Sequence, residues 1–152
     1  MNKQEQLMMS FRSLSFKIRW LDKINMEEVL NNYKPFEVHC IDYIGKNEDT
    51  NVTKLAKTFC VTNGAISKVA KKLMQKGAIE SYKRPNNKKE VYFKLTDEGQ
   101  KVYNTHKSAH QAFKKRDNII FDGFTDDELD VILNFTDKYL KYLNTAIEKT
   151  KR

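Results

Sequence analysis

The sequence predicts a mainly α-helical fold with one small β-hairpin. Charged residues make up 32% of the 152 residues, with five glycines and two prolines, which is typical of a helix-rich chain. Apolar residues recur every three or four positions near both ends, which favours long terminal helices. Between them, residues 78–95 are rich in β-forming residues around a polar turn. A hydrophobic share of 39% is enough for one domain with a core.

The first expected helix covers residues 5–30. One set of its apolar residues alternates steps of four and three, a coiled-coil-like period: Leu7, Phe11, Leu14, Ile18 and Leu21. A second set points to another side: Phe16, Trp20 and Ile24. A helix with two apolar faces must pack against more than one neighbour.

Three shorter helices are expected next. The first begins at Pro35 and ends at Gly45. Asn51 caps "NVTKLAKTF", and Thr62 caps "TNGAISKVAKKLMQKG", which ends at Gly77. Because two residues separate these last two helices, they are a helix-turn-helix candidate.

The second half of the chain predicts a hairpin and two long helices. "AIESYKR" and "EVYFKL" flank "PNNKK" and favour a two-stranded hairpin, and "LTDEG" begins a helix that extends to about residue 118. Thr125 and Glu128 form a capping box for the last helix. Apolar residues line one side of that helix: Leu129, Ile132, Leu133, Tyr139, Leu140 and Leu143. In so short a chain, that much apolar surface on the terminal helices indicates a partner subunit.

The second helix of the helix-turn-helix candidate has two different faces. Its apolar stripe is Ile66, Val69, Ala70, Leu73 and Met74. The opposite face, together with the cap, carries the candidate DNA-binding residues Thr62, Asn63, Gly64, Ser67, Lys68, Lys71 and Lys72. Short polar side chains at the N-terminal end suit base edges, and the lysines suit phosphates.

The hairpin adds a basic tip, with Lys83, Arg84, Lys88 and Lys89 around an Asn-Asn pair. Such a wing suits the minor groove, whose negative potential attracts cations. For a single helix, a solvated row of lysines is an equally good interpretation. The succession of helix-turn-helix, basic face and basic wing favours DNA, and so does a formal net charge of +8.

The segment "TNVTKLAKTFCVTNGAISKVAKKLMQKGAIE", the hairpin and "VYFKLTDEG" together resemble MarR-type winged helix-turn-helix repressors over nearly the whole chain. The resemblance implies a single domain over residues 1–152. Helices at about 5–30 and 97–150 would form an interlaced homodimer, and residues 35–96 would form the winged helix-turn-helix. It also implies a double-stranded DNA operator, with recognition helices in successive major grooves and wings in minor grooves.

The wing departs from the family's pattern. The family usually carries an Asp-Arg-Arg triplet before the second strand, and the matching residues are Asn87, Lys88 and Lys89. Lysine cannot make the planar bidentate contacts of arginine. The acid that would brace a wing arginine is missing from the triplet, so we expect weaker, purely electrostatic wing contacts.

His106 and His110 are four residues apart in an expected helix, so their imidazoles project from one face. Both could then reach one ion at the usual zinc distance of ~2.0–2.1 Å. Two histidines on the less polar side of a helix equally suit a structural role, and the spacing alone leaves both interpretations open.

The three histidines carry a narrower resemblance, to the zinc-uptake repressor (AdcR-like) branch of the MarR family. It rests on His39 in "FEVHC", on His106 and His110, and on "FTDDE" at residues 124–128. The resemblance implies that these histidines bind one zinc ion per chain and that zinc acts as co-repressor. Three imidazoles and one carboxylate would form a closed tetrahedral site, which suits sensing rather than catalysis.

The branch's fourth ligand is a glutamate in the first helix, and none aligns here without a gap. Asp22 is the nearest candidate, with Glu27 and Glu28 as alternatives. The branch's second metal site is expected to be absent, because Val38 and Thr105 stand in that region.

Other functions stay open at this point. The effector could instead be a small aromatic or lipophilic ligand, or an oxidant acting on Cys40, although Cys40 and Cys60 are expected to be small buried residues. A non-specific architectural DNA protein is a further alternative. No catalytic motif is found, so an enzyme is not expected. With two cysteines and no apolar run of ~20 residues, we expect a cytoplasmic protein without a membrane span.

Overall fold

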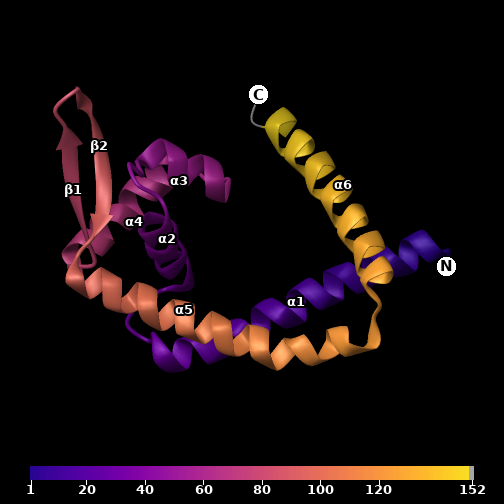
Figure 1. The fold of residues 1–152 in the computed structure, drawn as a ribbon. Coiled ribbons are helices and arrows are strands. Elements are labelled where there is room, and N and C mark those ends of the chain that lie inside the picture. The colour runs from indigo at the N-terminus through magenta and orange to yellow at the C-terminus, as the bar shows by residue number, and fades with distance from the viewer. Residues whose placement is uncertain (151–152) are drawn as a thin grey trace. The chain divides into compact units, whose positions relative to one another are not determined.

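A computed structural model describes residues 1–150 of the chain (Figure 1). The elements in chain order are α1 (Lys3–Val29), α2 (Pro35–Lys46), α3 (Val52–Phe59), α4 (Asn63–Gln75), β1 (Ile79–Arg84), β2 (Asn87–Leu95), α5 (Asp97–Asp117), the 3-10 helix η1 (Asn118–Gly123) and α6 (Asp126–Thr150). The predicted fold class is confirmed: the chain is mainly helical, with a two-stranded antiparallel hairpin that forms the wing of a winged helix-turn-helix.

The chain divides into two compact units, Met1–Phe113 and the part that begins at Lys114. The first unit holds α1 to α4, the hairpin and most of α5. The second holds the end of α5, η1 and α6.

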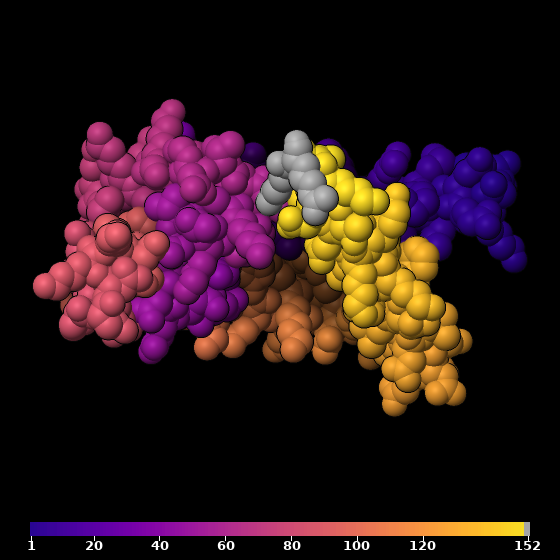
Figure 2. All heavy atoms as spheres, turned by 90° about the horizontal axis from the view of Figure 1, so that it is seen from above, coloured from indigo at the N-terminus to yellow at the C-terminus, as the bar shows by residue number. Residues whose placement is uncertain are grey.

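The core of the first unit lies among α2, α3, α4, the hairpin and the start of α5. Its largest fully buried side chains are Ile41, Leu55, Ile66, Leu73, Thr50 and Cys40. Figure 2 shows the atoms of the hairpin and of α2 to α4 as one continuous mass. The hairpin and the helix-turn-helix therefore share a single core, which fixes one against the other.

Local signals place the ends of these helices as predicted. The side chain of Asn51 accepts a hydrogen bond from the backbone of Lys54, and Thr62 caps α4 in the same way. Gly77 follows α4 with φ of 74°, a conformation that glycine adopts without strain. The expected end of α2 at Gly45 is wrong, because α2 continues to Lys46.

Gly45 has a packing role instead of ending the helix. A Cβ atom at this position would lie 2.5 Å from the Tyr103 ring of α5. The absence of a side chain at Gly45 therefore lets the Tyr103 ring of α5 pack directly on the backbone of α2.

The hairpin pairs Ile79 with Leu95 at its base and is interrupted by a bulge between Tyr82 and Arg84. It rises from the start of α5, with its turn at the far end (Figure 1). Beside it, the backbone N–H of Phe93 donates to the carbonyl of Thr50 at 2.8 Å, a bridge to the loop between α2 and α3.

Helices α1 and α6 bury none of their described residues within one chain. Large apolar side chains of α1 are exposed to solvent, including Phe16 at 65% and Trp20 at 57%. On α6, Val131, Leu133 and Tyr142 are equally open, at 69%, 63% and 68%. Among residues 1–150, no helix is both long and apolar enough to cross a membrane.

Candidate functional site

Helix α4 presents the polar face that the sequence predicts. Ile66, Ala70 and Leu73 are buried beneath it. The candidate DNA-binding residues on the opposite face are exposed, apart from the partly covered Lys72: Thr62, Asn63, Gly64, Ser67, Lys68 and Lys71. The Thr62 hydroxyl accepts a hydrogen bond from the backbone of Ala65 at 3.1 Å, so its oxygen already caps the helix.

Gly64 has no packing reason to be a glycine. A Cβ atom built there would meet the Thr62 hydroxyl oxygen at 4.0 Å and otherwise open space. Glycine in a helix costs roughly 1 kcal/mol relative to alanine. The backbone of the first turn of α4 is therefore accessible to a ligand at Gly64, where no side chain covers it.

Lys83, Lys88 and Lys89 of the wing are exposed, and so is Lys94, which pairs with Glu80. Lys88 and Lys89 lie within β2 and not in the turn, because β2 begins at Asn87. Their side chains therefore project from a paired strand that holds their backbone in place.

Arg84 differs from these lysines, because an acid braces it. Its Nε donates to Oδ1 of Asp49 at 2.8 Å, and its Nη2 lies 2.8 Å from the same oxygen. The acid comes from the loop between α2 and α3 and not from the wing. The triplet at residues 87–89 still lacks its acid, and the acid that braces Arg84 comes from another element.

Lys76 is the C-cap residue of α4 and joins that helix to α2. Its Nζ donates to Oε1 of Glu37 and to the carbonyl of Asn32, each at 2.8 Å, and lies 4.9 Å from the centre of the Tyr33 ring. The Glu37 side chain is only 3% exposed and also accepts from the backbone of Lys34. This ion pair, in which only the Glu37 side is buried, fixes the end of α4 against the start of α2.

The pKa of Glu37 reflects this environment. Burial alone raises the pKa of the carboxyl, but the hydrogen bonds from Lys76 and Lys34 and the positive charge of Lys76 lower it overall. A lowered pKa stabilises the fold above the ordinary value of 4.5, and the stabilisation is lost as the pH falls through the lowered value.

We expect Lys76→Ala to lower the free energy of unfolding by about 2 kcal/mol at pH 7, because it leaves a buried carboxylate without its partner. In that variant burial dominates and the pKa of Glu37 rises, so acid protonates the carboxyl and relieves the cost. The difference from the wild type should shrink at pH 4 in urea unfolding. Lys71→Ala, an exposed lysine on the same helix, is the control and should leave stability unchanged. A difference that is equal at both pH values would contradict the argument.

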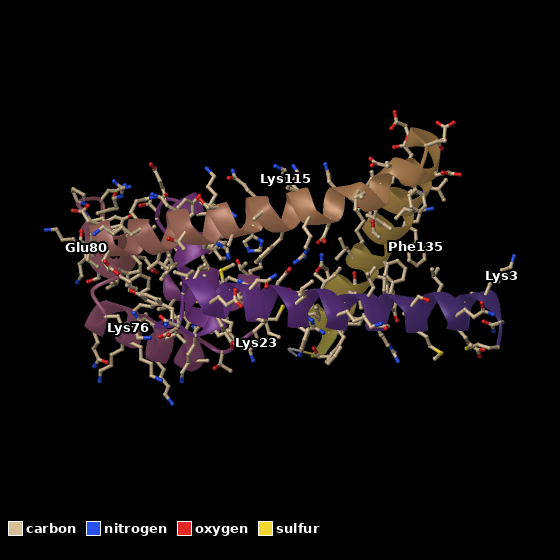
Figure 3. The ribbon with its side chains drawn as sticks, turned by 90° about the horizontal axis from the view of Figure 1, so that it is seen from below. Lys3, Lys23, Lys76, Glu80, Lys115 and Phe135 are labelled. Carbon is tan, nitrogen blue, oxygen red and sulfur yellow. The ribbon has the colours of Figure 1, made fainter. Side chains whose placement is uncertain are left out.

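All three histidines line one cavity of about 320 Å³, which we call the histidine cavity. Figure 3 shows side chains of α1 and α5 that point toward one another between these two helices. Helix α1 contributes Asp22, α2 contributes His39, and α5 contributes His106 and His110. The four residues singled out from the sequence therefore do border one space.

Within the histidine cavity, two imidazoles converge. Nε2 of His106 lies 2.8 Å from Nε2 of His110. The ring centre of His39 lies 6.3 Å from that of His106. Nδ1 of buried His106 lies 3.3 Å from Oδ1 of Asp42, a residue that sequence reasoning missed.

Burial lowers the pKa of His106 to about 4, helped by the charge of His110 and opposed by Asp42. Burial likewise lowers the pKa of His39. His106 is therefore neutral at pH 7, the form in which imidazole binds metals. As ligand types, three imidazoles and one carboxylate suit zinc. Within residues 1–150, however, no three His, Cys, Asp or Glu side chains converge closely enough to hold an ion as they stand.

The two cysteines differ. Cys40 is buried as expected, and burial raises the pKa of its thiol to about 12, so little reactive thiolate exists at neutral pH. Cys60 is exposed at the end of α3, with φ of 56°, so the expectation that it is buried is wrong. Its backbone makes the left-handed turn into α4, and that turn directs the side chain outward.

Residues 35–91, which include α2 to α4, β1 and the start of β2, match the model of the MarR family. The HTH-type transcriptional regulator YhjH of Bacillus subtilis (strain 168) is 37% identical over 93 residues, which are 61% of this chain and 53% of YhjH. The regulator PchR of the same organism is 32% identical over 111 residues, which are 73% of this chain and 63% of PchR. The chain thus spans 53% and 63% of the lengths of these two relatives.

A solved structure extends the likeness beyond the segment that matches the MarR-family model. Streptococcus pneumoniae FabT, crystallised in complex with DNA, superposes with a TM-score of 0.82 at 23% identity, over 95% of this chain and 99% of that chain. The chain therefore shares the fold of FabT over most of its length.

Proposed function

We propose that the protein is a sequence-specific DNA-binding transcriptional regulator that acts as a homodimeric repressor. The observation that carries the proposal is the outer face of α4, where an open glycine and short polar side chains precede exposed lysines. The relatives YhjH and PchR are HTH-type transcriptional regulators, and FabT was crystallised with DNA. Both facts support the proposal.

The arrangement suits a major groove. Asn63 and Ser67, on the first turns of α4, can bond to base edges, and Gly64 lets the backbone come close. Lys68 and Lys71 lie further along the helix, where they meet phosphates. The exposed lysines of the wing suit the minor groove beside it.

A competition assay at fixed salt tests the proposal. A genomic fragment selected by the protein should compete at least 1,000-fold better than random duplex of equal length, the usual margin for specific binders. Equal competition would show a non-specific architectural protein. No binding to either duplex would remove the DNA proposal altogether.

The homodimer rests on the exposed apolar faces of α1 and α6. Neither helix buries a described residue in one chain, yet a lone helix in water is only marginally stable. A second copy would cover these faces. It would also place two α4 helices on one duplex, where successive major grooves are ~34–36 Å apart.

We expect Trp20→Glu to weaken the dimer by about 100-fold, because it places a charge in the apolar surface that the partner copy covers. Sedimentation velocity at micromolar concentration should show monomers, and operator binding should fall with the dimer. Ser15→Glu adds the same charge on the side of α1 that carries Arg12, Arg19 and Asp22, and should leave the dimer intact. If both variants remain dimers, α1 is not the interface.

We propose further that zinc is the effector and acts as co-repressor at the histidine cavity. The pair His106 and His110 is already converged, and His39 and Asp22 border the same space. Movement of α1 or α2 toward α5 would complete the set. Binding would then tie the terminal helices to the DNA-reading part, which couples metal to DNA affinity.

A metal measurement separates zinc from the alternative effectors. Protein purified without chelator should carry about one zinc per chain, and added zinc should tighten operator binding. Less than one zinc, with unchanged DNA affinity, would favour a small ligand in the same cavity, where Met26, Leu30 and Val38 supply apolar walls. Oxidation of Cys40 is the weaker alternative because of its raised pKa.

A further inference from the structure

Asp49 of the loop between α2 and α3 forms a cluster with Tyr82 and Arg84 at the turn end of β1, which we call the wing anchor. The Tyr82 hydroxyl donates to Oδ1 of Asp49 at 2.8 Å and accepts from the Asp49 backbone N–H at 3.2 Å. Arg84 binds the same oxygen through Nε, and its guanidinium carbon lies 5.4 Å from the Tyr82 ring centre. The two wing side chains therefore converge on one carboxylate.

The loop that supplies Asp49 is itself held in place. Asp49 has φ of 52°, and Nζ of Lys54 on α3 donates to its carbonyl at 2.8 Å. Thr50 is fully buried, and its carbonyl accepts from Phe93 of β2. Asn51 caps α3 and donates through Nδ2 to Glu90 of β2 at 3.2 Å. Three consecutive loop residues thus join both strands of the wing to the first helix of the helix-turn-helix.

In this arrangement Arg84 already has an ion-pair partner. Its guanidinium is paired with Asp49, whereas the exposed lysines Lys83, Lys88 and Lys89 have no carboxylate within ion-pair distance among the described residues. The ion pair raises the pKa of Arg84 and lowers that of Asp49, and both stay charged at neutral pH. An arginine that binds DNA phosphate would have to exchange this partner.

We propose that Arg84 positions the wing and does not bind the DNA backbone, and that Asp49 sets the angle between the wing and α4. The wing anchor then determines which sequences are preferred beside the stretch that α4 contacts. This rests on the proposed DNA-binding function. The wing lysines make the contacts with DNA, and the wing anchor fixes the position of the strands that carry them.

Because Asp49 is negatively charged, two explanations predict opposite changes in operator affinity when it is replaced. Removing an acid close to a DNA-binding surface should, by electrostatics alone, strengthen binding to any duplex. It would also release Arg84 to bind phosphate. The proposal predicts the opposite for the operator, because a wing without its anchor loses its fixed angle.

Asp49→Asn is the suitable variant, since asparagine tolerates positive φ and keeps the shape of the side chain. Glu48→Gln is the matched control, because it makes the same change at the exposed neighbouring position. We expect Asp49→Asn to weaken operator binding about fivefold and to relax preference at flanking positions, with random-duplex binding unchanged or tighter. Glu48→Gln should bind operator as tightly as wild type or more tightly.

Asp49→Asn combined with Arg84→Ala should cost no more than either change alone, because both act through one contact. Operator binding by Asp49→Asn that equals or exceeds that of Glu48→Gln would overturn the proposal. So would additive costs in the double variant.

Hydrogen exchange on the free protein tests the anchor without DNA. Wing amides from Asn86 to Val91 should exchange faster in Asp49→Asn than in Glu48→Gln, and equal rates would overturn the anchor. If the wild type binds no duplex, the proposed function and the flanking preference both fall, and exchange still decides whether Asp49 orders the wing.

Discussion

Replacing Lys68 and Lys71 together by alanine is expected to lower operator affinity on the order of 100-fold at physiological salt. Both side chains are exposed on the outer face of α4, one turn apart. Each is placed to neutralise a phosphate and to release the counterion that the phosphate holds. In a dimer the double substitution removes four such contacts.

The salt dependence gives the sharper measurement. Because each phosphate contact contributes about 0.9 to the slope of log affinity against log salt, the slope of the dimer should become shallower by about 3.6. Binding isotherms at several salt concentrations provide it. Random duplex should lose affinity in parallel, since phosphates carry no sequence information.

Lys101 and Lys107 on α5 provide the control, because they are exposed and their removal makes the same change in net charge. Their double alanine variant should keep the wild-type slope. If it matches the Lys68 and Lys71 variant, net charge and not the face of α4 governs binding.

Elements that depend on near neighbours could be predicted from the sequence. The caps of α3 and α4 use residues three apart, and the buried stripe of α4 follows helical spacing. The capping box between Thr125 and Glu128 forms as expected. Each of these signals lies within one turn of chain, where spacing determines contact.

Contacts between distant residues could not be predicted in this way. Arg84 meets Asp49 across 35 positions, and Lys76 meets Glu37 across 39. The triplet at residues 87–89 lacks an acid, and the acid that braces Arg84 lies in another loop. Asp42 was missed for the same reason, because its contact with His106 joins two helices. The histidines were found because their residue type marks them wherever they stand.

His106→Ala combined with His110→Ala is expected to abolish any effect of zinc on operator binding and to leave a folded dimer. The two imidazoles are the converged part of the histidine cavity, with Nε2 atoms 2.8 Å apart. Neutral His106 can bind a metal without first losing a proton. Loss of a residue that only supports a ligand typically lowers metal affinity by about 10–100-fold, so loss of two ligands should remove the site.

The competing interpretation is a hydrogen bond between the two rings, in which one Nε2–H donates to the other. The pair would then stabilise α5 itself, His106 would keep its contact with Asp42 of α2, and neither ring would bind metal. Under that interpretation the double variant changes thermal stability, and zinc has no effect on DNA binding in either protein. Zinc titrations of operator affinity in both proteins distinguish the two.

Two further variants locate the other ligands. Ser108→Ala, between the two histidines on α5, is the control for changes to this helix and should keep the full zinc response. His39→Ala and Asp22→Asn should each weaken zinc binding if α2 and α1 close onto the pair. Because His39 lies on α2 and the pair on α5, its contribution requires a shift of these helices or a change of its side-chain rotamer. A zinc response that survives loss of His106 and His110 would place the ligands elsewhere, and the DNA-binding face of α4 would be unaffected.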